Sequence, residues 1–324
     1  MPESQGRVTL WGIEIFLATA EEGSITAAAR RLGASPSAVS QQLSGLEAAL
    51  GVSLLDRTAR PMRATPAGGM FRRHAQTIVN AAAEARAELA MSDMSALTTL
   101  RLGMIEDFDS TVTPHLLSLL AEDLRGCHFL LETGASHRLL DQLDQRALDV
   151  VVAADLGSGF DGGSWMEVHP LLTEPFVAVA PKGAISPARE GSSHLLDLPL
   201  IQYTARHHMG RQIAAHLARQ NLRLSRRFEL DSYHAILAMV ADGVGWTILT
   251  PLGVQHAAPF RGRVDVLPLP FEPFSRTISL SARAGVLHDM PARMAGLLRP
   301  VLQSSVVEPT VADLPWLKQE FRVL

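Results

Sequence analysis

Residues 24–51 read SITAAARRLGASPSAVSQQLSGLEAALG, and the pattern of this stretch decides the fold class of the first part of the chain. It predicts two short helices joined by a tight turn. Ser24 and Ser35 are favourable N-cap residues, and Gly33 fits the position just past a helix end, where a positive φ is needed. Pro36 takes the first position of the second helix, where its missing N–H costs no hydrogen bond.

The second of these helices has one apolar and one polar face. Its apolar residues recur at helical spacing and must face a core: Val39, Leu43, Leu46 and Leu50. The opposite face carries hydroxyl and amide side chains that donate and accept hydrogen bonds: Ser37, Ser40, Gln41 and Ser44. An ordinary solvated face is the alternative interpretation, but such faces usually carry Glu and Lys. We therefore predict that this helix reads the base edges of DNA.

A short basic hairpin is predicted directly after these helices. Residues 52–57 and 62–65 can form two strands, and three arginines fall in or between them: Arg57, Arg60 and Arg63. Each arginine alone could be an ordinary surface residue. Three of them beside a helix pair predict a winged helix-turn-helix, in which arginines of the wing contact phosphates or the minor groove.

A long helix is predicted from Pro66 onward, with Thr65 as its cap. Apolar residues follow at alternating steps of four and three, which is a heptad seam with small side chains: Phe71, Ala75, Ile78, Ala82, Ala85 and Leu89. The helix could instead fold back on its own domain. Because nothing else in this part of the chain is large enough to cover the seam, we predict a linker helix that dimerises the protein.

The composition of the chain narrows the possible classes of protein. Its 324 residues suffice for two or three domains, and a hydrophobic content of 47% supplies real cores. No apolar run reaches the ~18 residues that a membrane span needs, and the polar start predicts a cytoplasmic protein without a membrane partner. The net charge is −4, so a nucleic-acid surface must be a local basic patch.

Cys127 is the only cysteine of the sequence. This count excludes an intramolecular disulfide, a thiolate zinc cluster and a two-cysteine peroxide switch within the chain. His207, His208 and His216 match no standard metal spacing, and the sequence has no phosphate-binding loop and no nucleophile elbow. We therefore predict no metal, no cofactor and no catalytic residues.

Beyond residue 95 the pattern alternates between strands and helices. Two βαβ sets with a late returning strand predict an α/β domain of two lobes that close on small molecules. Strands are predicted at 100–104, 127–132, 150–153, 175–180, 200–203, 228–230, 246–249 and 277–281, and helices at 113–120, 136–143, 209–220, 232–241 and 290–302.

Ligands of open α/β sheets bind at the carboxyl ends of strands, near helix N-termini. The corresponding positions, each of which could instead be ordinary capping or loop solvation, are Asp107, Phe108, Ser110, Thr111, Ser136, Thr204, Arg206, Ser232 and Thr247. Hydroxyls, helix N-termini and an arginine suit a carboxylate, whereas Glu106, Asp107 and Asp109 would repel one or bind an amino group. We predict a small polar effector that carries a carboxylate or is amino-acid-like.

These patterns divide the chain into four parts. Within the effector domain, lobe one would cover about 98–171 and 275–304, and lobe two about 172–274. The apolar residues of the tail could dock on a lobe or on a neighbouring subunit. We predict the winged helix-turn-helix at 8–65, the linker helix at 66–95, the effector domain at 96–304 and the tail at 305–324.

The first part of the chain resembles the DNA-binding domain of LysR-type transcriptional regulators. Pro36, Ser37 and Gln41 depart from the family pattern, and Gln41 would favour adenine where an arginine would favour guanine. The resemblance runs from Phe16 to about Ile78 and includes Ala28-Ala29, Ala38-Val39-Ser40, Leu46-Glu47 and Thr65-Pro66-Ala67-Gly68.

The second part is similar to the effector domain of the same family, at Leu102-Gly103, Leu148-Asp149-Val150 and 240–246. The resemblance implies the fold of periplasmic solute-binding proteins. It also implies a regulator that binds promoter DNA as a homodimer or homotetramer, with RNA polymerase as a further candidate partner. A two-lobed solute-binding protein or enzyme without DNA binding is the alternative. The candidate DNA contacts are Ser35, Pro36, Ser37, Ser40, Gln41, Ser44, Arg57, Arg60, Arg63 and Thr65.

Overall fold

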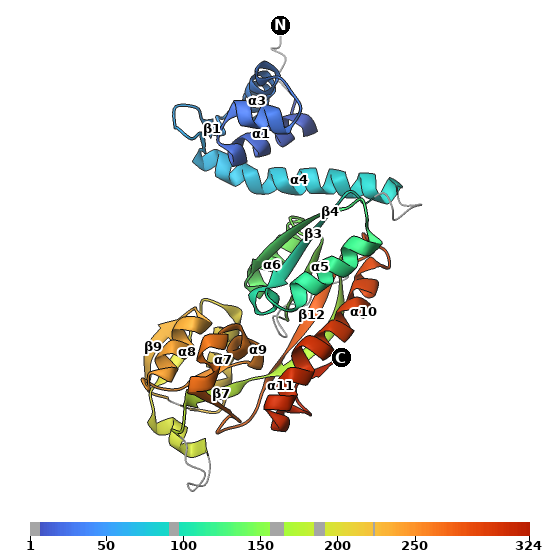
Figure 1. Ribbon diagram of the computed structural model, residues 1–324. Coiled ribbons are helices and arrows are strands. Elements are labelled where there is room, and N and C mark those ends of the chain that lie inside the picture. Colours follow the sequence, from blue (N-terminus) through green and yellow to red (C-terminus); the bar gives the residue numbers. More distant parts are fainter. Residues whose placement is uncertain (1–6, 91–96, 156–164, 185–191, 223) are drawn as a thin grey trace. The chain divides into compact units, whose positions relative to one another are not determined.

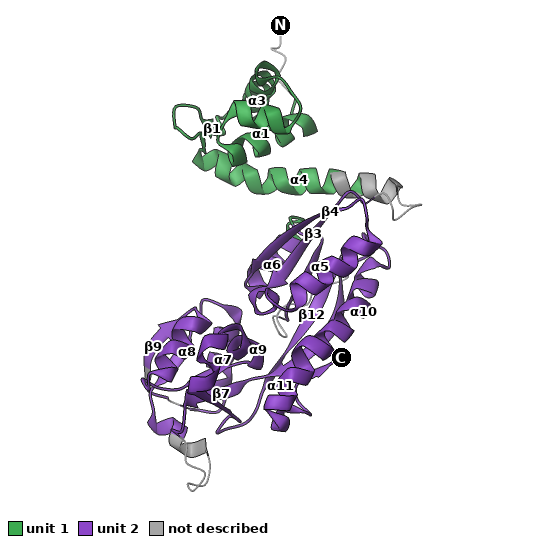
Figure 2. Cartoon of the chain, in the orientation of Figure 1, with its two compact units in different colours: residues 1–96, 144–147 green, residues 97–143, 148–324 purple. Residues whose placement is uncertain are grey.

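The structure is a computed structural model that describes residues 7–90, 97–155, 165–184, 192–222 and 224–324. The chain forms two compact units (Figure 2). The first unit comprises residues 1–96 with 144–147, and the second comprises 97–143 with 148–324. The first unit holds the predicted helix pair, and the second holds the alternating strands and helices.

Three helices build the core of the first unit: α1 (Leu10–Glu22), α2 (Ile25–Arg31) and α3 (Pro36–Leu50). The Ser24 and Ser35 side chains accept hydrogen bonds from the first turns of α2 and α3, as predicted. Gly51 ends α3 with a φ of +68°. The apolar face of α3 lies in the core, where Val39 and Leu43 are fully buried.

A two-stranded antiparallel hairpin follows α3. Its strands, β1 (Leu55–Asp56) and β2 (Arg63–Ala64), are shorter than the predicted ones. The long helix α4 (Pro66–Ala90) then begins with the Thr65 hydroxyl accepting from Gly68 N at 3.0 Å. A Cβ at Gly68 would lie 2.0 Å from Leu54 O, so only glycine lets α4 approach the hairpin this closely.

The first turns of α4 pack on the core of their own unit. Ala75 is fully buried, and the Phe71 and Phe16 ring centroids are 5.3 Å apart. The expectation that nothing in this unit could cover the seam is therefore wrong for its first half. Ile78 is 44% exposed, so the seam leaves that core about three turns into the helix. The side chain of Leu89 lies outside the described residues.

A six-stranded sheet forms the centre of lobe one of the second unit. Its strand order is β13-β6-β12-β5-β3-β4, in which β3 pairs in parallel with β4 and β5 while the other pairs are antiparallel. The strands are β3 (Thr99–Ile105), β4 (His128–Gly134), β5 (Val150–Ala154), β6 (Met166–Pro175), β12 (Ser275–Arg283) and β13 (Arg322–Val323). The helices of this lobe are α5 (Val112–Asp123), α6 (Ser136–Asp144) and α10 (Met290–Leu302) (Figure 1).

Lobe two is built on smaller sheets. The antiparallel set β10-β7-β11 lies beside the parallel pair β8-β9, and a bridge between Leu200 and Trp246 links them. The predicted strand 175–180 corresponds to β7, and only its first residue, Pro175, belongs to the end of β6, where the chain leaves lobe one. The elements are β7 (Val177–Pro181), β8 (Leu200–Tyr203), β9 (Arg226–Leu230), β10 (Thr247–Leu249), β11 (Val264–Leu267), α7 (His208–Arg219), α8 (Tyr233–Ala241) and α9 (Pro251–His256).

The C-terminal segment belongs to this unit and is not a separate tail. Helix α10 continues through a π-helical turn (Gln303–Val307) into α11 (Glu308–Asp313). Strand β13 then pairs with Leu172 and Thr173 of β6, and Phe321 beside it is fully buried. Of the two docking alternatives left open, the structure takes the lobe of its own chain.

In the described part of the chain, no helix is both long and apolar enough to cross a membrane. Across the same residues, no group of three or more His, Cys, Asp and Glu side chains is arranged to hold a metal ion.

Candidate functional site

The polar face of α3 is open to solvent. Ser37, Gln41 and Ser44 are exposed, and Ser40 is half-buried. These side chains are short or end in an amide, so they can present donors and acceptors to base edges. The Ser35 hydroxyl is instead engaged with Ala38 N at 3.2 Å and the Ser37 hydroxyl at 3.1 Å.

Glu47 joins this helix to the hairpin. Its Oε1 accepts hydrogen bonds from Leu54 N at 2.7 Å and Leu55 N at 3.2 Å. Its Oε2 accepts from Arg57 Nη2 at 2.7 Å, and the same nitrogen donates to Ser44 Oγ at 3.0 Å. The Arg57 guanidinium therefore orients the hairpin against α3.

The other basic residues of the hairpin have different surroundings. Arg60 and Arg63 are exposed, so their guanidinium groups are open to solvent at the surface beside α3. The Thr65 hydroxyl donates to Ser53 O at 2.8 Å and caps α4, which gives it a structural task within the unit. Pro36 is exposed at the first turn of α3.

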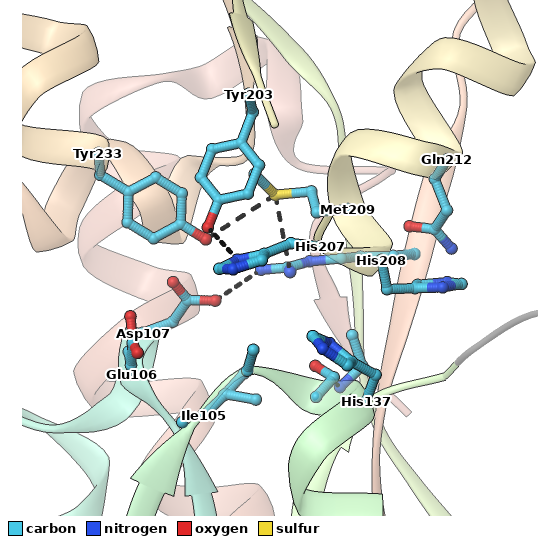
Figure 3. A pocket seen from close by; sticks show the side chains of 15 residues that line it. Ile105, Glu106, Asp107, His137, Tyr203, His207, His208, Met209, Gln212 and Tyr233 are labelled. Carbon is cyan, nitrogen blue, oxygen red and sulfur yellow. Dashed lines mark hydrogen bonds and ion pairs between the residues drawn. The ribbon is translucent and has the colours of Figure 1, made fainter. Parts of the chain in front are cut away.

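The second unit holds a pocket lined from both lobes (Figure 3). Lobe one contributes the end of β3 with the turn that follows it, the start of α6, and Arg276 of β12. Lobe two contributes Tyr203 at the end of β8, the start of α7, and Tyr233 of α8. The cavity has a volume of about 50 Å³. Its lining residues are Ile105, Glu106, Asp107, Gly134, Ala135, Ser136, His137, Ala154, Tyr203, His207, His208, Met209, Gln212, Tyr233 and Arg276.

A buried ion cluster forms one wall of the pocket. Arg276 Nη2 lies 2.8 Å from Asp107 Oδ2, and Arg276 Nε lies 2.7 Å from Glu174 Oε2. All three side chains are at most 5% exposed. Glu174 Oε1 also accepts from Leu252 N at 2.7 Å. Because a buried charge must be paired to be tolerated, these contacts fix the side chains in place.

Electrostatics of the pocket follow from burial. Burial raises the pKa of Glu174. The neighbouring Arg276 guanidinium lowers this pKa, and the Asp107 carboxylate raises it further. Burial also raises the pKa of the Tyr203 and Tyr233 hydroxyls, with the nearby Asp107 carboxylate adding to it. Both tyrosines therefore remain neutral hydrogen-bonding groups at neutral pH.

Histidines from the two lobes face each other across the pocket. The His137 ring of lobe one and the His207 ring of lobe two have centroids 5.8 Å apart. Burial lowers the pKa of His137 and of His208, and nearby cations, including Arg211, lower both further. His137 and His208 are therefore predominantly neutral at pH 7 and can each donate and accept a hydrogen bond.

Four buried polar atoms on the pocket wall have no hydrogen-bond partner in the described structure: Asp107 Oδ1, His137 Nδ1, His208 Nε2 and Gln212 Oε1. Two of them come from each lobe. Buried polar groups in native proteins are nearly always satisfied. Unsatisfied groups gathered around one cavity are therefore the signature expected of a site for a polar ligand or ordered water.

Two of the nine predicted effector residues line this pocket, Asp107 and Ser136. Phe108 is fully buried in the core, and the Thr204 and Thr247 hydroxyls donate to Glu229 and Ile201 O respectively. Ser232 caps α8. Ser110, Thr111 and Arg206 are not among the lining residues either.

Sequence reasoning missed Arg276, Tyr233 and Gln212 altogether. Arg276 lies on a returning strand and Tyr233 and Gln212 lie within helices, so the rule about strand ends does not select them. His207 and His208 lie in the segment 204–208 that follows β8 and that the rule about strand ends selects, but Thr204 and Arg206 are the residues predicted from it. The sequence feature that indicates them is two adjacent histidines, which can each donate and accept a hydrogen bond, at the start of the predicted helix.

Comparison with known proteins places both units in one family. The model of the bacterial regulatory helix-turn-helix protein, lysR family, matches residues 10–69, and that of the LysR substrate binding domain matches residues 96–299. A probable hydrogen peroxide-inducible genes activator of Mycobacterium avium is 30% identical over 94% of this chain and 97% of its own. The DNA-binding transcriptional dual regulator OxyR of Escherichia coli is 28% identical over 91% of this chain and 98% of its own.

Solved structures agree on the fold. A full-length OxyR variant from Pseudomonas aeruginosa superposes with a TM-score of 0.67 at 24% identity, covering 93% of this chain and 96% of the other. Full-length CbnR in complex with its target DNA gives a TM-score of 0.59 at 19% identity, covering 91% and 100%. With an exposed polar recognition helix, a wing and a two-lobed sensor domain, the chain belongs to the LysR family of transcriptional regulators.

Proposed function

We propose that this regulator reads promoter DNA with the exposed face of α3 and answers to a small polar molecule bound in the pocket between its lobes. The observation that carries the second half of the proposal is the set of four unpartnered buried polar atoms, two from each lobe, among the residues that line the pocket. A ligand that satisfies them would bind both lobes at once and so hold them at one mutual angle.

On the DNA side, Ser37, Ser40, Gln41 and Ser44 are the proposed base-reading group. Arg60 and Arg63 are the proposed phosphate or minor-groove contacts, because both are exposed on the wing. Arg57, Ser35 and Thr65 support these contacts by positioning the hairpin and the helix ends. A homodimer or homotetramer would present two or more copies of α3 to a promoter with repeated half-sites, and the exposed Ile78 of α4 supports such an assembly.

The name of the Mycobacterium avium relative refers to hydrogen peroxide, but a peroxide switch between two cysteines of this chain is excluded. Its only cysteine, Cys127, can form no disulfide within the chain. Cys127 is half-buried just before β4 and does not line the pocket, and burial together with Asp149 raises the pKa of its thiol. We therefore propose an effector that binds reversibly and is not chemically changed by the protein. It is a carboxylate or an amino-acid-like metabolite, and the protein acts in the cytoplasm.

Gel retention with the DNA upstream of the gene tests the DNA half of the proposal. Sharp retention by the full chain that weakens steeply as salt rises is expected, because bound phosphates release counterions. The same fragment with a scrambled sequence is the control. An absence of retention at every salt concentration would instead favour a two-lobed binding protein or enzyme without DNA binding.

A further inference from the structure

The two sides of the pocket differ in charge. Glu106 and Asp107 lie on one side, whereas His137, His208 and Gln212 lie on the other (Figure 3). Carboxylates contribute most of the charge that acts on the Tyr203 hydroxyl on the first side. Asp107, Glu106 and Asp231 raise its pKa, and Arg276 opposes them. This side of the pocket therefore favours a positive group.

Asp107 offers a fixed acceptor on that side. Its side chain is only 4% exposed, and Oδ2 is held by Arg276. The other oxygen, Oδ1, is buried without a partner. A carboxylate oxygen accepts hydrogen bonds only, so the group that satisfies it must donate one. A charged donor such as an ammonium forms the stronger bond with an ionised carboxylate.

The charge of Arg276 is balanced by carboxylates of the protein itself. Its Nε donates to Glu174 and its Nη2 to Asp107 and to the Thr250 hydroxyl at 3.3 Å. Its Nη1 contacts Met209 Sδ at 4.0 Å. Because Asp107 and Glu174 both pair with this one guanidinium, the cluster favours a cation over an anion as its further partner.

The opposite side supplies partners for an anion. The first turns of α6 and α7, helices of nine and twelve residues, both line the pocket. Backbone N–H groups of a first helical turn lack intrahelical partners and carry partial positive charge. Arg211 adds a positive field there, since it lowers the pKa of both His137 and His208. This side therefore favours a negative group.

We propose that Asp107 Oδ1 is an ammonium-binding subsite and that the effector is a small zwitterion whose anionic group lies at the starts of α6 and α7. The inference deepens the proposed function and rests on it, because it assigns a ligand class to the same pocket. The cavity of about 50 Å³ restricts the ligand to a few non-hydrogen atoms unless the lobes open.

Matched triplets of probes test this subsite on the full chain. Each triplet holds an amino acid, the acid that lacks its amino group, and the compound that lacks its α-carboxylate. The first triplet is L-alanine, propionate and the plain amine ethylamine, and the second is L-aspartate, succinate and β-alanine, which keeps one carboxylate. Calorimetric titration and thermal shift should show at least one amino acid binding roughly tenfold or more tightly than the acid of its triplet. Equal affinity of the amino acid and its acid, or no binding by any member of either triplet, would overturn the proposal.

Two variants separate the subsite from general effects of charge. Asp107→Asn should weaken binding of the amino acid roughly ten- to hundredfold and leave the affinity of the matched acid unchanged. Asp109→Asn, an exposed aspartate two residues away that does not line the pocket, should change neither. Unchanged amino-acid affinity in a folded Asp107→Asn protein would overturn the proposal. If Asp107→Asn fails to fold, the triplets on the unaltered chain still decide.

The outcomes distinguish this inference from the proposed function. If succinate binds as tightly as L-aspartate and alters retention of the upstream DNA, the regulator proposal stands and the ammonium subsite fails. If an amino acid binds through Asp107 but the full chain retains no DNA at any salt concentration, the subsite stands and the regulator proposal fails.

Discussion

A single side chain connects α3, the proposed DNA-reading helix, to the β1–β2 hairpin that forms the wing. Glu47 lies on the half-buried flank of α3 and binds two backbone N–H groups of the hairpin as well as Arg57. In the sequence Glu47 is only an acidic residue next to Leu46, and nothing local indicates these partners. Its carboxylate therefore holds Arg57 and the start of the hairpin against α3.

Replacing Glu47 by alanine should destabilise the first unit by about 1–3 kcal/mol, because two backbone donors and a guanidinium lose their acceptor. Urea denaturation followed by circular dichroism measures this loss. Glu21→Ala is the matched control, since Glu21 is 58% exposed and pairs with Arg31 at the surface. That control should cost less than about 1 kcal/mol. Equal losses for the two variants would contradict the proposed role of Glu47.

Gln41 and Arg60 should affect DNA binding in different ways. Gln41→Ala should reduce discrimination between the operator and scrambled DNA by about 1–3 kcal/mol, because a side chain that reads base edges is lost. Arg60→Ala should weaken binding to both DNAs equally and lower the salt slope by about 1. Each variant serves as the control for the other in retention assays over a range of salt. Unchanged sequence preference in Gln41→Ala would contradict the assignment of the reading face.

The pocket histidines should make the stability of the second unit fall in mild acid. The pKa values of His137 and His208 lie below the ordinary value of about 6.5 in the folded state. The unfolded chain therefore binds protons first as the pH drops through about 6.5, and this favours unfolding. The double variant with His137→Gln and His208→Gln should lose less stability between pH 7.5 and 5.5 in thermal melts. An identical pH slope in the variant would refute the argument.

At the scale of elements, the C-terminal segment completes the sheet of lobe one. Strand β13 covers the outer edge of β6, and Arg299 holds the chain end by donating to Leu324 O at 2.6 Å and Pro170 O at 3.0 Å. Thr310 and Asp313 of α11 also contact Gln255 and Arg261 of lobe two. The segment therefore touches both lobes, although it lies beyond the residues matched by the family model, which end at 299.

Phe321→Ala should destabilise the second unit by about 3–5 kcal/mol, because a fully buried aromatic side chain leaves a cavity. Trp316→Ala is the control from the same segment, since Trp316 is 38% exposed. A surface change of this kind usually stays within about 0.5 kcal/mol. Denaturant titration measures both variants. A loss below 1 kcal/mol for Phe321→Ala would mean that the segment adds little to the fold.

Helices were more predictable from the sequence than strands. The bounds of α2, α3 and α10 follow from caps, a proline in the first turn and apolar spacing, which act over a few residues. Strands β6, β11 and β13 were not predicted. Their partners are far away in the chain, so the hydrogen bonds that define these strands leave no local pattern.

At the scale of the whole molecule, each unit has a core of its own. Calorimetry should therefore resolve two unfolding transitions, as expected for units that unfold separately. Glu47→Ala should lower only the transition of the first unit, and Phe321→Ala only that of the second. A single transition shifted equally by both variants would show that the units unfold together.

The sequence by itself determined the family, the helix-turn-helix and the two-lobed class, because helix caps, turns and periodic apolar faces depend on residues that are close together in the chain. Only the tertiary structure decided the chemistry of the pocket. Arg276 meets Glu174 across 102 positions of the chain and Asp107 across 169. Whether Asp107 Oδ1 has a partner depends on residues that the fold brings next to it from distant parts of the chain. A pattern of neighbouring residues cannot show such contacts.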